Sequence, residues 1–143
     1  MTDYNKVALL TLRGDRLLLC RKDRLASNLI LPGGCIEPGE SAMECLAREL
    51  REELGGAAAS NLRFVGEYSD IAASENPGEV KTLHIRLYQG ELQGVPAPSS
   101  EIVELVWFGP DSDFSQLTPI MIHHILPDLL RRKILPWSID RLH

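Results

Sequence analysis

Residues 34–56 read GCIEPGESAMECLARELREELGG, and this stretch decides the fold that we expect for the chain. Glu40 and Ser41 are typical of the start of a helix, and Gly55 and Gly56 are typical of its end. Between them, apolar residues recur at helical spacing. They are Met43, Leu46, Leu50 and Leu54. The pattern predicts one unbroken helix over residues 40–54 with a single packing face.

Three glutamates lie on the arc of this helix beside its apolar face: Glu49, Glu52 and Glu53. Like charges one turn apart weaken a helix by roughly 0.2–0.5 kcal/mol per pair, so a sequence chosen for stability alone would not place Glu49 over Glu53. A bound cation removes this repulsion. Carboxylates without His or Cys suit Mg²⁺, with Mn²⁺ as a substitute. The alternative is a solvated face on which Arg48 and Arg51 offset the glutamates.

The loop before the helix favours the metal site over the solvated face. Leu31 and Pro32 lead into Gly33 and Gly34. Two adjacent glycines let the backbone approach a ligand or a metal ion closely. We therefore expect a divalent cation where this loop meets the helix.

The spacing of these residues resembles the signature of the Nudix hydrolase family. That signature reads G, five residues, E, seven residues, then R-E-U-x-E-E-x-G-U, where U is a bulky aliphatic residue. The residues that match are Gly34, Glu40, Arg48, Glu49, Leu50, Glu52, Glu53 and Gly55. Gly56 departs from the aliphatic position, which affects packing after the helix and no ligand position. The resemblance implies an α/β Nudix fold, an α/β/α sandwich with a central mixed sheet and a loop-helix-loop catalytic motif.

The resemblance also implies roles for individual residues. Metal ligands would be the backbone carbonyl of Gly33 and the carboxylates of Glu49, Glu52 and Glu53. Gly34, Glu40 and Arg48 would support the loop and orient the ligands, with Arg48 counted in the catalytic set. Many family members add an acid from a distant loop shortly before a late Trp. Glu101, six residues before Trp107, is the first choice for this additional ligand or general base, and Glu104 is the second.

Apolar alternation predicts the other elements. Residues 6–12 and 16–20 read as a hairpin around Gly14, and residues 62–69, 81–89 and 102–108 read as strands. Residues 57–61 read as a connection, and residues 71–79 as a loop that is either a substrate-side flap or plain surface. From Thr118 a helix is expected, with Thr118 as its N-cap, Pro119 at its first position and Pro127 kinking or dividing it.

The strand over residues 81–89 carries a polar row opposite its apolar row. His84 and Arg86 are candidates to bind substrate phosphates, and Tyr88 is a candidate to stack on a base. The alternative is that this row is ordinary exposed sheet surface.

Composition agrees with one small enzyme domain over residues 1–143. The net charge of -5 argues against binding of duplex nucleic acid, which relies on clustered Lys and Arg. Cys20, Cys35 and Cys45 lack paired metal-ligand spacing and read as reduced thiols in a cytoplasmic protein. We expect neither a secretion signal nor a membrane span, and the sequence leaves a homodimer open.

The resemblance implies Mg²⁺-dependent hydrolysis of a phosphoanhydride in a nucleoside diphosphate linked to another group. Our working hypothesis is a nucleoside triphosphate pyrophosphatase acting on normal, deoxy or damaged nucleotides. The runner-up is an ADP-ribose or other nucleotide-sugar pyrophosphatase, because residues 71–74 lack the Pro or Tyr that marks some of those subfamilies. A third alternative is a non-catalytic domain that senses a nucleotide, although every expected glutamate is present.

Overall fold

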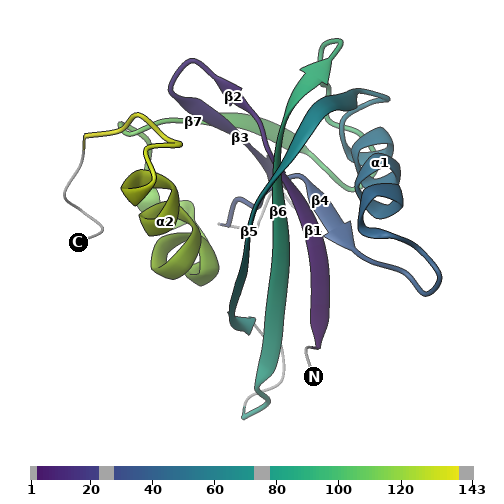
Figure 1. Ribbon diagram of the computed structural model, residues 1–143, viewed down its shortest axis with the longest axis horizontal. Coiled ribbons are helices and arrows are strands. Elements are labelled where there is room, and N and C mark those ends of the chain that lie inside the picture. Colours follow the sequence, from purple (N-terminus) through teal and green to yellow (C-terminus); the bar gives the residue numbers. More distant parts are fainter. Residues whose placement is uncertain (1–2, 23–27, 73–77, 139–143) are drawn as a thin grey trace.

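The computed structural model describes residues 3–22, 28–72 and 78–138. Its strands form two sheets, and helices pack on both sides of them (Figure 1). The four-stranded sheet has the order β4-β1-β6-β5, and the three-stranded sheet has the order β2-β3-β7. The strands of the first are β1 (Tyr4–Leu10), β4 (Gly33–Cys35), β5 (Ala58–Ala72) and β6 (Lys81–Gln93). Those of the second are β2 (Leu12–Arg13), β3 (Arg16–Arg21) and β7 (Glu104–Phe108).

The first sheet is mixed, as the fold class requires. β1 pairs in parallel with β6, and both β4 and β5 run antiparallel to their neighbours. Register places Lys6 between Cys35 of β4 and Ile85 of β6. The expected hairpin around Gly14 is confirmed, because Leu12 pairs with Leu17. The chain changes sheet after Leu10, so β1 and β2 are separate strands.

Strand alternation divides the interior into two cores. Val7 and Leu9 pack with Leu46 and Leu50 of α1 (Ala42–Glu53) on one side. The residues between and after them along β1 point the other way, where they pack with C-terminal helical residues such as Met121 and Leu129. These C-terminal elements are η1 (Phe114–Gln116), the π-helical η2 (Met121–Ile125) and α2 (Leu126–Arg131). The sheets therefore lie between two helical layers, which confirms the expected sandwich.

Helix α1 lies within the predicted range of residues 40–54, but it begins two residues later, at Ala42, and ends one residue earlier, at Glu53. Ser41 is the N-cap, and its hydroxyl accepts from the Glu44 N–H while the Glu44 carboxylate accepts from the Ser41 N–H. The C-cap is Leu54. Beyond it, the loop before β7 is tied to the end of the helix, since the Ser99 N–H donates to the Glu53 carbonyl at 3.1 Å. The loop that carries Glu101 is thus held beside the last turn of α1.

Several strand boundaries differ from the sequence predictions, including the end of β6, which continues to Gln93 and does not stop at residue 89. β5 begins at Ala58 and not at residue 62, so the predicted connection over residues 57–61 is wrong from Ala58 onward. Ala58 and Ala59 belong to this strand because they pair with Gln93 and Leu92 at the end of β6. The register shifts between Ser60 and Arg63, where Asn61 has a φ of 54°. β7 begins at Glu104 and not at residue 102. Residues 71 and 72 belong to β5, and residues 73–77 of the predicted loop lie outside the described residues.

The C-terminal helical segment begins at Pro119, as predicted. It then widens into the π-helical η2, where the Leu126 N–H donates to the Met121 carbonyl. α2 begins at Leu126, one residue before Pro127. Because Pro127 has no N–H to donate, the change of helix type at this point accommodates it. The division expected at Pro127 is therefore present.

We predict that Gly33→Ala destabilises the protein far more than Gly14→Ala. Both glycines have a positive φ, 138° and 63°, so both variants carry backbone strain of about 1–2 kcal/mol. An added Cβ at Gly33 would also lie 2.1 Å from the Val7 carbonyl oxygen, whereas none would meet an atom within 4 Å at Gly14. Urea unfolding should show an additional loss of about 2 kcal/mol or more for Gly33→Ala. Equal losses would contradict the close approach of β4 to β1.

Candidate active site

Glu53, at the end of α1, has a carboxylate buried between the helix and Gly33–Gly34. We call these two residues the glycine loop, as in the sequence analysis, although the structure places them in strand β4. The exposed fraction of Glu53 is 1%. Oε1 accepts from the Gly33 N–H at 2.8 Å, while Oε2 has no hydrogen-bond partner among the described residues. Burial raises the pKa of Glu53 to about 7, and the neighbouring Glu49 adds to the rise. A buried oxygen without a partner is costly, so this position calls for a ligand.

Glu49 lies one turn earlier, with its carboxylate against the backbone of Gly34. An added Cβ at Gly34 would lie 2.4 Å from Glu49 Cδ, so a larger residue would displace the Glu49 carboxylate from this position. Burial raises the pKa of Glu49, and Arg48 opposes the rise by donating from Nη1 to Glu49 Oε1 at 2.9 Å. Both glycines of the loop therefore serve a carboxylate of the helix, Gly33 through its N–H and Gly34 through its lack of a side chain.

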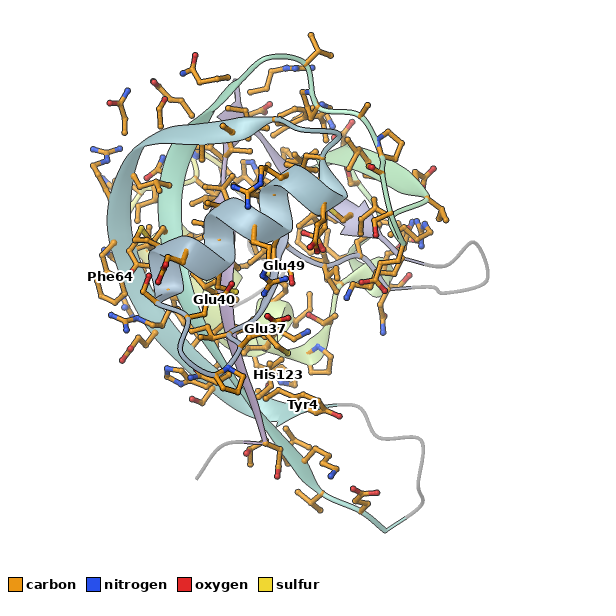
Figure 2. The ribbon with its side chains drawn as sticks, turned by 90° about the vertical axis from the view of Figure 1, so that its right-hand side faces the viewer. Tyr4, Glu37, Glu40, Glu49, Phe64 and His123 are labelled. Carbon is orange, nitrogen blue, oxygen red and sulfur yellow. The ribbon has the colours of Figure 1, made fainter. Side chains whose placement is uncertain are left out.

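Arg48 links the helix to the loop that precedes it. Its Nε donates to Glu40 Oε2 at 2.8 Å and its Nη2 donates to Glu40 Oε1 at 3.0 Å. This paired contact lowers the pKa of Glu40 to about 2, helped by the Glu37 N–H. In Figure 2, Glu37, Glu40 and Glu49 lie in one region where the loop meets α1. Arg48 and Glu40 thus hold the position of Glu49, which is the arrangement expected of supporting residues.

Glu52, the third glutamate, points more toward solvent than the other two. Its side chain is 51% exposed and lies 3.6 Å from Arg48 Nη1. No group of three His, Cys, Asp or Glu side chains is already gathered in metal-binding geometry within residues 3–22, 28–72 and 78–138. Glu49 accepts a hydrogen bond from Arg48, and Glu53 accepts one from the Gly33 N–H. These two donors offset the negative charge of the carboxylates, as a bound cation would.

The residues present fit a hard divalent cation. Glu49 and Glu53 supply oxygen donors, and Glu53 Oε2 is buried with no hydrogen-bond partner among the residues that the structure describes. Both glutamates lie in the last two turns of α1, where the helix dipole favours positive charge. The Gly33 N–H donates a hydrogen bond to the Glu53 carboxylate, so the backbone of Gly33 lies beside the carboxylate. Its assignment as a ligand through the carbonyl stays a prediction.

The two candidates for the distant acid have different surroundings. Glu101 is 66% exposed, 3.9 Å from Lys22 Nζ, and its charge contributes to the raised pKa of Glu53. Glu104 accepts from Arg21 Nε at 2.8 Å across the β3–β7 pairing. The charge of Glu101 is thus felt by the buried Glu53, and its contact with Lys22 is long, whereas Glu104 makes a short ion pair with Arg21 at 2.8 Å. The sequence did not indicate a role for Lys22. Its positive charge opposes the rise in the pKa of both Glu49 and Glu53.

A cleft lies on the other side of the glycine loop. Its inner part is lined by Gly33, Gly34 and Ile85, and its outer part, of about 290 Å³, is lined by Tyr4, Asn28 and Ile71. Five residues line both parts and make the cleft continuous: Lys6, Ile30, Leu83, Thr118 and Ile120. We call this space the apolar cleft. Its lining was missed in the sequence, although Lys6 interrupts the otherwise apolar row of Ala8 and Leu10 in β1.

The polar row of β6 does not face the apolar cleft. His84, Arg86 and Tyr88 alternate with Leu83 and Ile85, so they point to the opposite face of the sheet. There, His84 Nδ1 lies 2.8 Å from Ser69 Oγ and Arg86 Nε lies 3.5 Å from Glu67. Tyr88 packs edge-on against Phe64 with ring centroids 5.5 Å apart. A substrate-binding role for this row stays a prediction, and the cleft offers a different site.

Comparison with known proteins gives matches along most of the chain. The family model described as NUDIX domain matches residues 4–124. The solution structure of the E. coli ORF135 protein is 29% identical, with a TM-score of 0.65 and 96% of each chain covered. A NUDIX hydrolase from Nitrosomonas europaea is 23% identical, with a TM-score of 0.71 and 94% and 97% of the two chains covered. The second of these likenesses supports the fold alone.

Curated relatives match over shorter regions. NAD-capped RNA hydrolase NudC of Pseudomonas aeruginosa is 32% identical over 105 residues, which are 72% of this chain and 35% of that protein. The protein of the same name from Stutzerimonas stutzeri is 51% identical over 47 residues, 32% of this chain and 17% of that protein. The chain thus spans about a third or less of the length of these relatives. Among the described residues, no helix combines the length and apolar character of a membrane span.

We predict that the metal-free protein loses stability as the pH rises from 4.5 to 8, and that Glu53→Gln removes part of this loss. The folded-state pKa of Glu53, about 7, is above its ordinary value of 4.5. The folded protein therefore holds this proton more tightly than the unfolded chain, and the stabilisation is lost as the pH passes through 7. The difference is on the order of 3 kcal/mol.

The measurement is urea unfolding in EDTA at several pH values. The difference in the free energy of unfolding between wild type and Glu53→Gln isolates the contribution of this carboxylate, since the other titrating groups are common to both proteins. Glu104→Gln, which removes an exposed carboxylate, is the matched control and should follow the wild type. Parallel curves for wild type and Glu53→Gln would show that Glu53 is not the titrating group.

Proposed function

The chain belongs to the NUDIX family, and from this premise we propose that it hydrolyses a phosphoanhydride bond of a nucleoside diphosphate derivative with the help of Mg²⁺. The substrate class that we propose is a nucleoside triphosphate, including deoxy or damaged forms, cleaved to a nucleotide and pyrophosphate. Mn²⁺ is the expected substitute metal. The observation that carries the proposal is the buried Glu53 carboxylate. One of its oxygens accepts from the Gly33 N–H, and the other has no partner in the part of the chain that the structure describes.

Glu49, Glu52 and Glu53 would hold the metal, with Gly33 contributing its carbonyl. Bound Mg²⁺ would neutralise charge on the phosphates and lower the pKa of a water molecule. The protein's own contribution is to hold the carboxylates in place. Arg48 does so by binding Glu40 and Glu49 together, and these carboxylates raise its pKa further above its usual range. Loss of Arg48 would free Glu49 to turn away from Gly34.

Glu101 is our candidate to accept the proton of the attacking water. It is exposed, close to Lys22 and held near Glu53 by the loop that caps α1. The contact of Glu101 with Lys22 is long, at 3.9 Å, which suits a general base better than the 2.8 Å ion pair of Glu104 with Arg21. Lys22, beside Glu101, adds positive charge where a polyphosphate would lie.

The apolar cleft is where we place the nucleoside. Small-molecule sites are mostly apolar with a few polar groups, and the cleft has this composition. It meets the edge strand β4 at Gly33 and Gly34, so the phosphates of a nucleoside in the cleft would pass this edge to reach the carboxylates of α1. This arrangement replaces the polar row of β6 as our first choice for base binding.

A second candidate substrate is a dinucleotide or nucleotide sugar such as ADP-ribose. The relatives named NAD-capped RNA hydrolase favour this class, because NAD contains a pyrophosphate between two nucleosides. An RNA end that carries such a cap therefore belongs among the substrates to test, although the net charge of -5 disfavours duplex nucleic acid. A nucleotide-sensing domain without catalysis is the third candidate. Product analysis by mass with Mg²⁺ over these substrates separates the three.

We predict that hydrolysis stops in EDTA and returns with Mg²⁺ or Mn²⁺, and that Glu53→Gln lowers turnover by about 10²–10⁴. The substitution keeps the size of the side chain and removes its charge. Glu104→Gln removes an equal charge outside the carboxylate cluster and is the control. Steady-state kinetics on a nucleoside triphosphate provide the measurement. Full turnover in EDTA, or an unchanged rate in Glu53→Gln, would contradict the proposed site.

We also predict that Glu101→Gln lowers kcat more than it raises KM, with a smaller effect from Glu104→Gln. Glu101 would act on the reacting water, whereas Glu104 serves the Arg21 pair at the edge of β7. If Glu104→Gln has the larger effect, the general base is assigned to Glu104. If neither matters, the helix glutamates suffice.

A further inference from the structure

Lys6 is the one charged side chain among the described residues that line the apolar cleft. It lies in β1, in the interior of the four-stranded sheet, where its register partners are Cys35 and Ile85. Its backbone is therefore fixed from both sides. Strand alternation turns Lys6 to the same side as Ala8 and away from α1.

The described residues around Lys6 give it no anionic partner. No ion pair or side-chain hydrogen bond of Lys6 occurs within the described part of the chain, and its neighbours in the cleft are mainly apolar, such as Ile30, Leu83 and Ile120. A long lysine stem can cover apolar surface while its ammonium reaches water. This arrangement would explain a lysine at an ordinary surface. Lys6, however, lines the same part of the cleft as Gly33 and Gly34, which contact the carboxylates of α1.

The ammonium of Lys6 has three donors and no acceptor, so it pairs only with groups that accept hydrogen bonds. A nucleobase in the cleft would place its flat faces on the apolar side chains and its polar edge toward Lys6. Guanine and thymine or uracil carry a carbonyl oxygen at the edge where adenine and cytosine carry an amino group. A donor facing an amino group leaves both without a partner, which is unfavourable in a partly dry site.

We propose that Lys6 is a specificity-determining residue that donates a hydrogen bond to a base carbonyl, so that the protein prefers keto bases (guanine, thymine and uracil) to amino bases (adenine and cytosine). The proposal rests on the proposed function, because it assumes that the cleft holds the nucleoside of the substrate. A phosphate is a less suitable partner, since moving its charge among Ile30, Leu83 and Ile120 would cost solvation that one ammonium offsets only in part.

The test compares wild type with Lys6→Met, which keeps the apolar stem and removes the donor. Lys81→Met removes the same charge from the same sheet at a residue that pairs with Glu79, and it is the matched control. kcat/KM is measured with Mg²⁺ on dGTP, dTTP, dATP and dCTP. Binding of the α,β-imido analogues of GTP and ATP is measured by calorimetry, which needs no turnover.

In wild type we expect dGTP and dTTP to be preferred. Lys6→Met should reduce this preference, and the GTP-to-ATP affinity ratio of the analogues, by about tenfold or more, while Lys81→Met leaves both ratios unchanged. Lys6→Arg retains a donor and should keep part of the preference. An equal loss on all four substrates would assign Lys6 to phosphate, and no change would make it a surface lysine. Either result overturns the proposal.

The binding measurement separates this proposal from the proposed reaction. If none of the triphosphates is hydrolysed but analogue binding depends on Lys6 and on the base, the base-reading role stands and the hydrolysis proposal falls. If all four are hydrolysed at rates that Lys6→Met leaves in the same ratio, hydrolysis stands and the role of Lys6 falls. Preference for ATP or ADP-ribose in wild type would also overturn the role of Lys6.

Discussion

The hydrogen bond from the Gly33 N–H to the Glu53 carboxylate is the contact on which the arrangement of the site depends. It joins the last turn of α1 to β4, a strand of only three residues. β4 approaches β1 so closely that Gly33 has no room for a side chain. The carboxylate is therefore buried by the same packing that joins the helix to the sheet. Its second oxygen has no hydrogen-bond partner within residues 3–22, 28–72 and 78–138, and this cost falls at a position that the family signature also marks.

Arg48 resolves the remaining concentration of negative charge. Four carboxylates, those of Glu37, Glu40, Glu49 and Glu52, lie within 4 Å of its guanidinium. A single cation cannot satisfy all of them equally. The short contacts go to Glu40 and Glu49, and Glu52 stays half exposed at 3.6 Å. This division explains why the glutamates are close together without yet forming a closed set of ligands, and why Glu52 is the one that we expect to move most when a cation binds.

The parts of the molecule that could be predicted from the sequence are those set by local spacing. Ser41 and Glu44 fix the start of α1, and the glutamate spacing places Glu49 and Glu53 on one side of it. The extent of β5 could not be predicted, because Ala58 and Ala59 become strand only by pairing with Gln93 and Leu92. The alternation in β6 was predicted correctly. The sequence could not show which face of β6 meets the cleft, because that depends on tertiary contacts: β1 lies beside β6, and Ile120 lines the cleft together with Leu83. Lys6 was overlooked for the same reason.

Binding of Mn²⁺ to the protein without substrate tests the central claim most directly, because the metal's own magnetic resonance signal reports it and no turnover is needed. The account predicts one or more sites in wild type, weaker binding by at least tenfold in Glu53→Gln, and wild-type binding in Glu104→Gln, whose carboxylate pairs with Arg21. Binding of equal strength in wild type and Glu53→Gln would contradict the claim that the buried carboxylate beside Gly33 is the centre of a metal site.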